Sequence, residues 1–123
     1  MQPHVLVADD DSDSRDLVQF LLQAAGFRVS VSGNPAEVLC LAERQCFDAV
    51  LLDNWMPDIT GLELCHRIRT FDQKTPILFC SGAVREEDKR DAVLAGAQGY
   101  IAKPFDPDDL IKTLRAAIKV SQL

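Results

Sequence analysis

The segment VLVADDDSDSR, residues 5–15, joins a short apolar run to a group of acidic residues, and the rest of the chain can be interpreted outward from it. Asp9, Asp10 and Asp11 follow the apolar run directly, and Asp13 comes two residues later. At an effective dielectric constant of about 20, two like unit charges about 4 Å apart oppose each other by about 4 kcal/mol. Clustered carboxylates therefore need solvent, a bound cation or a calcium loop to offset this repulsion.

Short apolar runs alternate with helical periodicity along the whole chain. The runs lie at 4–8, 27–31, 47–53, 76–80 and 99–102. After the first run, Leu17, Leu21 and Ala25 repeat every four residues, with Val18 and Leu22 beside them. Five strands that alternate with five helices predict a doubly wound α/β fold, in which a parallel sheet carries helices on both faces.

Helix boundaries can be recognised from local signals. Gly26 is placed to end the first helix. Asn34 followed by Pro35, with Glu37 three residues after the asparagine, is typical of a helix start. Asp106 and Pro107 open the last helix in a similar way. These signals place the turns of the predicted fold.

The composition indicates one globular domain over residues 1–123, with 47% hydrophobic and 26% charged residues. The net charge of −6 argues against nucleic acid binding and suits a chain that binds a cation or a basic partner. The N-terminus does not resemble a signal peptide, and no apolar run is long enough to span a membrane, so we expect a cytoplasmic protein. We interpret the four cysteines as reduced thiols packed like small apolar side chains.

Polar residues follow four of the five predicted strands. They are Asp9–Asp11 after the first strand, Asp53 after the third, Ser81 after the fourth and Lys103 after the fifth. Ligands of open parallel sheets bind at the carboxyl ends of the strands. The sequence therefore predicts that these side chains share one crevice.

Two functions can be weighed against the spacing of the acids. A calcium loop that starts at Asp9 needs glycine at its sixth position and glutamate at its twelfth, but Ser14 and Phe20 stand there. A phosphatase-like enzyme could use Asp9 as nucleophile and Asp11 as acid, although the chain lacks the length for a substrate cap. The calcium loop fails, and the phosphatase-like enzyme stays as an alternative.

A third function uses all four strand ends. Asp9, Asp10 and Asp53 would form an acidic pocket for Mg²⁺, which prefers oxygen ligands. Asp53 could then attack a phosphorus atom whose oxygens are neutralised by the metal and by Lys103, with Ser81 as a hydrogen-bond donor. The product would be an acyl phosphate on Asp53.

Four segments closely resemble the receiver domain of two-component response regulators: VLVADDD, AVLLDNWMPDITGLEL, PILFCSGA and AGAQGYIAKPF. The resemblance covers essentially the whole chain and implies a flavodoxin-like fold with strand order 2-1-3-4-5. It implies that Asp53 is the phosphoacceptor, that Asp10 ligates Mg²⁺ directly and that Asp9 acts largely through water. The backbone carbonyl of Trp55 would complete the metal ligands, and Mn²⁺ could replace Mg²⁺.

The resemblance also implies a switch. Ser81 falls at the hydroxyl switch position, Lys103 at the lysine that contacts the phosphoryl group, and Tyr100 at the aromatic switch position. Lys103–Pro104 matches a peptide bond that is typically cis in this family.

The implied function is a signalling switch that catalyses only its own phosphorylation and dephosphorylation. A sensor histidine kinase or a histidine phosphotransfer protein would donate the phosphoryl group. Phosphorylation would shift the surface of the fourth helix, fifth strand and fifth helix, which is either a solvated face or the site of a phosphorylation-dependent homodimer or effector. The alternative from another class is a degenerate receiver that binds partners without being phosphorylated.

Overall fold

The structure is a computed structural model that describes residues 2–54, 56, 58–82 and 85–122. Strands and helices alternate along the chain. Their bounds are β1 (His4–Ala8), α1 (Ser12–Ala24), β2 (Arg28–Ser32), α2 (Pro35–Arg44), β3 (Ala49–Leu52), α3 (Gly61–Arg69), β4 (Ile77–Ser81), α4 (Glu86–Leu94), β5 (Gly99–Ala102) and α5 (Pro107–Ser121).

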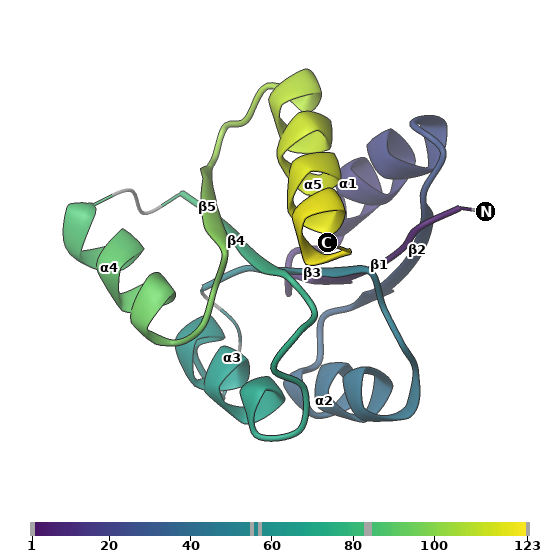
Figure 1. Cartoon of the computed structure of the whole chain (residues 1–123). Helices are drawn as coiled ribbons and strands as arrows, with labels where there is room; N and C mark the ends of the chain where they lie inside the picture. Colours follow the sequence, from purple (N-terminus) through teal and green to yellow (C-terminus); the bar gives the residue numbers. More distant parts are fainter. Residues whose placement is uncertain (1, 55, 57, 83–84, 123) are drawn as a thin grey trace.

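The strands form one five-stranded sheet in the order β2-β1-β3-β4-β5, and every neighbouring pair is parallel. Helices α1 and α5 cover one face of the sheet, and α2, α3 and α4 lie on the other side (Figure 1). This arrangement confirms the predicted flavodoxin-like fold and strand order. It also brings the carboxyl ends of β1, β3, β4 and β5 to one edge.

Strand β3 and the part of β1 that follows His4 are apolar, as expected for strands with both faces buried. On β1, Val5 and Val7 pack into the core beneath α1 and α5, whereas Leu6 and Ala8 pack into the core beneath α2 and α3. The side chains of a strand point alternately to its two faces, so one continuous apolar run serves both cores. The central strands are thereby held firmly beneath the residues that follow them.

The predicted helix caps are confirmed. The Asn34 carboxamide oxygen accepts hydrogen bonds from the backbone N–H groups of Ala36, at 2.9 Å, and Glu37, at 3.2 Å. The Asp106 carboxylate accepts from the backbone N–H of Asp108 at 2.8 Å. Gly26 follows α1 with φ of 97°, a left-handed conformation that favours glycine.

Three details differ from the sequence-based expectations. Phe27 and Phe47 were predicted as strand residues, but each lies before its strand and is buried by side-chain packing alone. An apolar pattern indicates which side chains are buried, but not which residues form the backbone hydrogen bonds of a strand. It therefore predicts a strand start that is too early. On α1, Val18 and Leu22 are buried, whereas Leu17 is 53% exposed.

The interpretation of the cysteines is half correct. Cys65 and Cys80 are buried free thiols, but Cys40 and Cys46 are exposed free thiols and do not pack as small apolar side chains. Cys40 lies on the solvent side of α2, and Cys46 follows the end of that helix. Among the described residues, no helix combines the length and the apolar character that crossing a membrane requires.

Candidate functional site

Three carboxylates meet at the carboxyl edge of the sheet. The Asp53 backbone N–H donates to the Ala8 carbonyl at 2.9 Å, which sets Asp53 beside the end of β1. Oxygen atoms of Asp9, Asp10 and Asp53 all lie within 4.8 Å of one another. Asp9 is buried, Asp53 is half-buried and Asp10 is exposed. Three converging carboxylates, one of them open to solvent, fit a hard divalent cation.

Lys103 is the cation that faces this cluster in the structure. It follows β5 and precedes a cis Lys103–Pro104 peptide bond, as expected. Its ammonium nitrogen lies 2.8 Å from Oδ2 of Asp9 and 3.9 Å from Oδ2 of Asp53. Lys103 therefore pairs mainly with Asp9 and only approaches the predicted phosphoacceptor.

The Asp9–Lys103 pair sets the charge state of both groups. Burial by itself raises the pKa of Asp9, but hydrogen bonds from Lys103, the Asp11 backbone and Ser14 outweigh it, so the pKa is lowered. Burial likewise opposes the charge of Lys103, yet Asp9 and Asp53 raise the pKa of that ammonium. Both side chains are therefore charged near neutral pH.

Ser81 and Tyr100 lie on the same side of the crevice. Ser81 ends β4 and is fully buried, and its carbonyl accepts from the Lys103 backbone N–H at 3.0 Å. Burial raises the pKa of the Tyr100 phenol, whereas its side-chain hydrogen bond with Ser81 acts in the opposite direction. The Tyr100 ring also lies near Phe79, with ring centroids 6.1 Å apart. The two predicted switch residues are thus already linked in this structure.

The segment after β3 approaches the start of α3 very closely. A Cβ atom at Gly61 would lie 2.6 Å from the Asp53 carbonyl oxygen and 2.9 Å from Cα of Asn54. Only glycine fits this contact, which holds the backbone of Asp53 against α3. The carbonyl of Trp55, predicted as a metal ligand, lies outside the described residues.

Two residues of the site escaped the sequence analysis. The Ser14 hydroxyl lies 3.1 Å from the Lys103 ammonium, and the Arg15 guanidinium donates to the Asp9 carbonyl at 2.8 Å. Both belong to the first turn of α1. No sequence motif marks these two residues. Their position about one helical turn after the clustered acids was a signal that could have identified them.

Cys80 lies next to this site but does not take part in its chemistry as a nucleophile. Its position on β4 buries the thiol, and burial raises the pKa of that thiol to about 11. The thiolate is the reactive form of cysteine, so this side chain stays protonated and inert near neutral pH.

The sequence matches the model of the response regulator receiver domain family over residues 5–115. The chain therefore belongs to this family, whose members are the phosphorylation-controlled signalling switches of two-component systems. Receiver domains typically act as switches and not as enzymes that turn over a separate substrate.

Individual relatives agree with this assignment. An uncharacterized 14.6 kDa protein from Leptolyngbya boryana is 37% identical over 93% of this chain and 88% of its own length. Chemotaxis protein CheY4 of Vibrio cholerae is similar in structure, with a TM-score of 0.91 and 34% identity over 95% of this chain and 99% of that chain.

A receiver domain of a Pseudomonas aeruginosa sensor histidine kinase has a magnesium ion coordinated in its active-site cleft. It superposes with a TM-score of 0.89 and 26% identity over 97% of this chain and 99% of that chain. The chain spans only about half the length of several transcriptional regulators that it matches.

Proposed function

We propose that this chain is a switch that is phosphorylated on Asp53 in a Mg²⁺-dependent reaction. The observation that carries the proposal is the meeting of Asp9, Asp10 and Asp53 within 4.8 Å, with the Lys103 ammonium 3.9 Å from Asp53. Asp10 and Asp53 would hold the ion, with Asp9 acting largely through water and the Trp55 carbonyl as a further ligand. Mn²⁺ would serve in place of Mg²⁺ because it accepts the same oxygen ligands.

The reaction transfers one phosphoryl group. A carboxylate oxygen of Asp53 attacks the phosphorus, an O–P bond forms, and the P–N bond of the donor phosphohistidine breaks. The bond electrons return to the imidazole nitrogen, which takes up a proton. Bound Mg²⁺ would neutralise charge on the phosphoryl oxygens, and Lys103 would contact one of them. The chain would catalyse only this step and the later hydrolysis.

The acyl phosphate would be detected through Ser81 and Tyr100. The Ser81 hydroxyl would hydrogen-bond a phosphoryl oxygen, and the hydrogen bond that it shares with Tyr100 would carry this change to β5. An added phosphate would bring a charge of about −1.5 to −2 next to Lys103 and the two neighbouring carboxylates.

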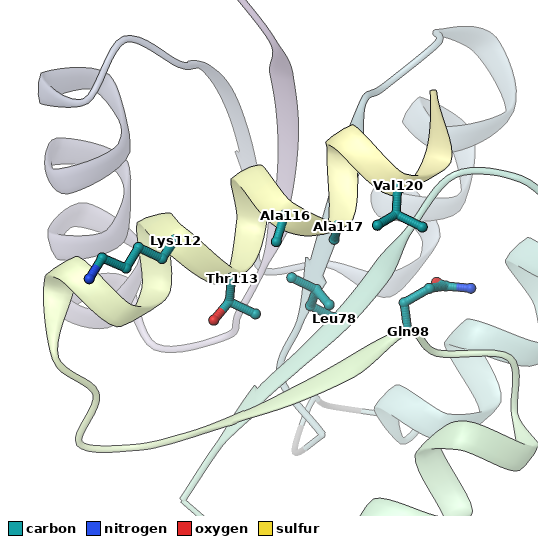
Figure 2. Close-up of a pocket in the computed structure, with 7 residues that line it drawn as sticks. All are labelled: Leu78, Gln98, Lys112, Thr113, Ala116, Ala117 and Val120. Carbon is teal, nitrogen blue, oxygen red and sulfur yellow. The ribbon is translucent and has the colours of Figure 1, made fainter. Parts of the chain in front are cut away.

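The expected output surface is formed by α4, β5 and α5. Val93 and Leu94 of α4 are 64% and 81% exposed. A groove of about 500 Å³ lies along α5, where Thr113, Ala117 and Val120 face Leu78 of β4 and Gln98 (Figure 2). These exposed apolar groups favour an interaction surface over a purely solvated face.

The proposed partners follow from the family. A sensor histidine kinase or histidine phosphotransfer protein would be the donor, and a phosphorylation-dependent homodimer is one form of the output. With a net charge of −6, we expect no direct nucleic acid contact by this chain. We place the protein in the cytoplasm and treat residues 1–123 as one receiver domain.

Acetyl phosphate tests the proposal without knowledge of the natural donor. The full chain is incubated with acetyl phosphate and Mg²⁺, and its intact mass is followed with time. We expect the mass of one added phosphoryl group, which disappears when EDTA is present from the start. Asp53→Asn should abolish the added mass, because the amide is not a nucleophile at this centre.

Asp58→Asn is the matched control. Asp58 is an exposed acid in the same β3–α3 loop and lies outside the three-carboxylate cluster, so this variant should be phosphorylated like the wild type. If the wild type gains no mass with acetyl phosphate, the proposal fails. The chain would then be a degenerate receiver that binds partners in its unphosphorylated form.

A further inference from the structure

Ser14 is a second acceptor for the Lys103 ammonium, beside the Asp9 carboxylate. It is half-buried in the first turn of α1, and its hydroxyl oxygen accepts from the Lys103 ammonium at 3.1 Å. The Asp9 carboxylate accepts from the same ammonium at 2.8 Å. The ammonium therefore donates to both side chains.

These two hydrogen bonds restrain the lysine ammonium. A lysine side chain has a flexible four-carbon stem, and a single carboxylate partner leaves its ammonium free to turn about one contact. Two acceptors at 2.8 Å and 3.1 Å fix the nitrogen much more tightly. The ammonium carries three N–H donors, so one donor is left beside Asp53, whose Oδ2 is 3.9 Å away.

The Asp9 acceptor is fixed as well. Oδ1 of Asp9 accepts from the Asp11 backbone N–H at 3.0 Å, and the Asp9 carbonyl accepts from Arg15 at 2.8 Å. The Arg15 guanidinium lies against Gly33, where a Cβ atom would collide with it. Asp9 is therefore held in place. Ser14 is the second acceptor that fixes the position of the Lys103 ammonium.

We propose that Ser14 is a positioning residue for phosphoryl transfer to Asp53. By holding the Lys103 ammonium 3.9 Å from Asp53, it prepares the lysine to contact an oxygen of the incoming phosphoryl group. Such preorganisation speeds a reaction because the charged group does not have to be ordered during the step itself. The inference rests on the proposed function of Asp53.

The test measures the rate of Asp53 phosphorylation by acetyl phosphate and Mg²⁺ in the full chain, as a function of acetyl phosphate concentration. Ser14→Ala should lower the maximal rate about three- to tenfold, and Ser14→Thr, which keeps the hydroxyl, should restore most of it. Ser12→Ala is the matched control, because Ser12 is an exposed serine in the same helical turn. It should react like the wild type.

A double-mutant cycle separates positioning from a general structural effect. In a Lys103→Ala background, followed over hours by intact mass, Ser14→Ala should cause no further loss, because the group that it positions is absent. Thermal unfolding of each variant checks that the fold is kept.

The outcomes distinguish the two proposals. A wild type that is never phosphorylated overturns the function proposed for Asp53 and this inference with it. A phosphorylated wild type whose Ser14→Ala variant reacts within twofold of it overturns only the role of Ser14. The role of Ser14 is also overturned if Ser14→Ala slows phosphorylation equally in the Lys103→Ala background, or if Ser14→Thr does not restore the rate.

Discussion

The two ends of the parallel sheet use charge in opposite ways. At the amino ends of β4 and β5, the Arg69 guanidinium donates to the carbonyls of Gly96, at 2.9 and 3.1 Å, and Asp72, at 3.0 Å, and to the Gln98 side chain at 2.9 Å. The Gln98 side-chain oxygen also accepts from the Ile77 backbone N–H at 2.7 Å. One cation there bonds three residues in the two segments that precede β4 and β5.

At the carboxyl ends, three carboxylates share one lysine. Asp9, Asp10 and Asp53 repel one another, and Lys103 offsets only part of that repulsion. The difference between the two ends separates stability from function. At the amino end, neutral acceptors from neighbouring segments surround one cation and hold those segments together. The carboxyl end keeps surplus negative charge, which fits a divalent cation.

Arg69→Ala gives the largest expected effect on stability. Removing the guanidinium leaves two backbone carbonyls and the Gln98 amide without their charged donor, so the free energy of unfolding should fall by about 2–3 kcal/mol. Urea denaturation measures this loss. Arg67→Ala is the control: its ion pair with Glu63 is 3.1 Å long but about half exposed on both sides, and its loss should cost less than about 0.5 kcal/mol. Equal losses in the two variants would contradict the stabilising role of the amino end.

Mg²⁺ should stabilise the protein through the carboxyl end. An ion present at about tenfold its dissociation constant adds about 1.4 kcal/mol to the free energy of unfolding, because it binds only the folded state. Thermal unfolding with and without Mg²⁺ measures the effect, and Asp10→Asn should remove most of it.

The Asp10→Asn variant also tests whether the three carboxylates repel one another in the metal-free protein. Without metal, Asp10→Asn removes one of three repelling carboxylates, so it should leave the free energy of unfolding unchanged or raise it slightly. The three carboxylates are not under electrostatic strain if the melting temperature does not change with Mg²⁺, or if the Asp10→Asn variant is less stable than the wild type without metal.

The smallest effect concerns pH at the amino end. Burial tends to raise the pKa of Asp72, but hydrogen bonds from Thr75 and Lys74 and the charge of Arg69 lower it below its ordinary value of 3.8. A carboxyl group whose pKa is lower in the folded protein stabilises the fold above its unfolded pKa, and this contribution is lost as the pH falls through the folded pKa. Asp72→Asn should therefore flatten the decline of stability below about pH 4. An unchanged acid denaturation profile would contradict this contribution.

Much of the fold could be predicted because its signals are local. Alternating apolar runs and helical segments, the Asn34 and Asp106 caps and the left-handed Gly26 each depend on a few neighbouring residues. The predicted strand starts were wrong at Phe27 and Phe47, because these side chains are buried although the residues lie before their strands. On α1, the four-residue repeat that includes Leu17 did not show that Val18 and Leu22 would form the buried face.

The sequence by itself determined which strand ends carry functional groups, because all parallel strands present their carboxyl ends to one edge and the order of these residues matches the receiver family. The functions of Asp53, Ser81 and Lys103 in the reaction stay predictions. Only the tertiary structure decided that Lys103 pairs with Asp9 more closely than with Asp53. It also decided that Ser14, 89 residues away in sequence, completes this contact. Such contacts depend on how side chains from distant elements pack, and no local pattern of residues encodes that packing.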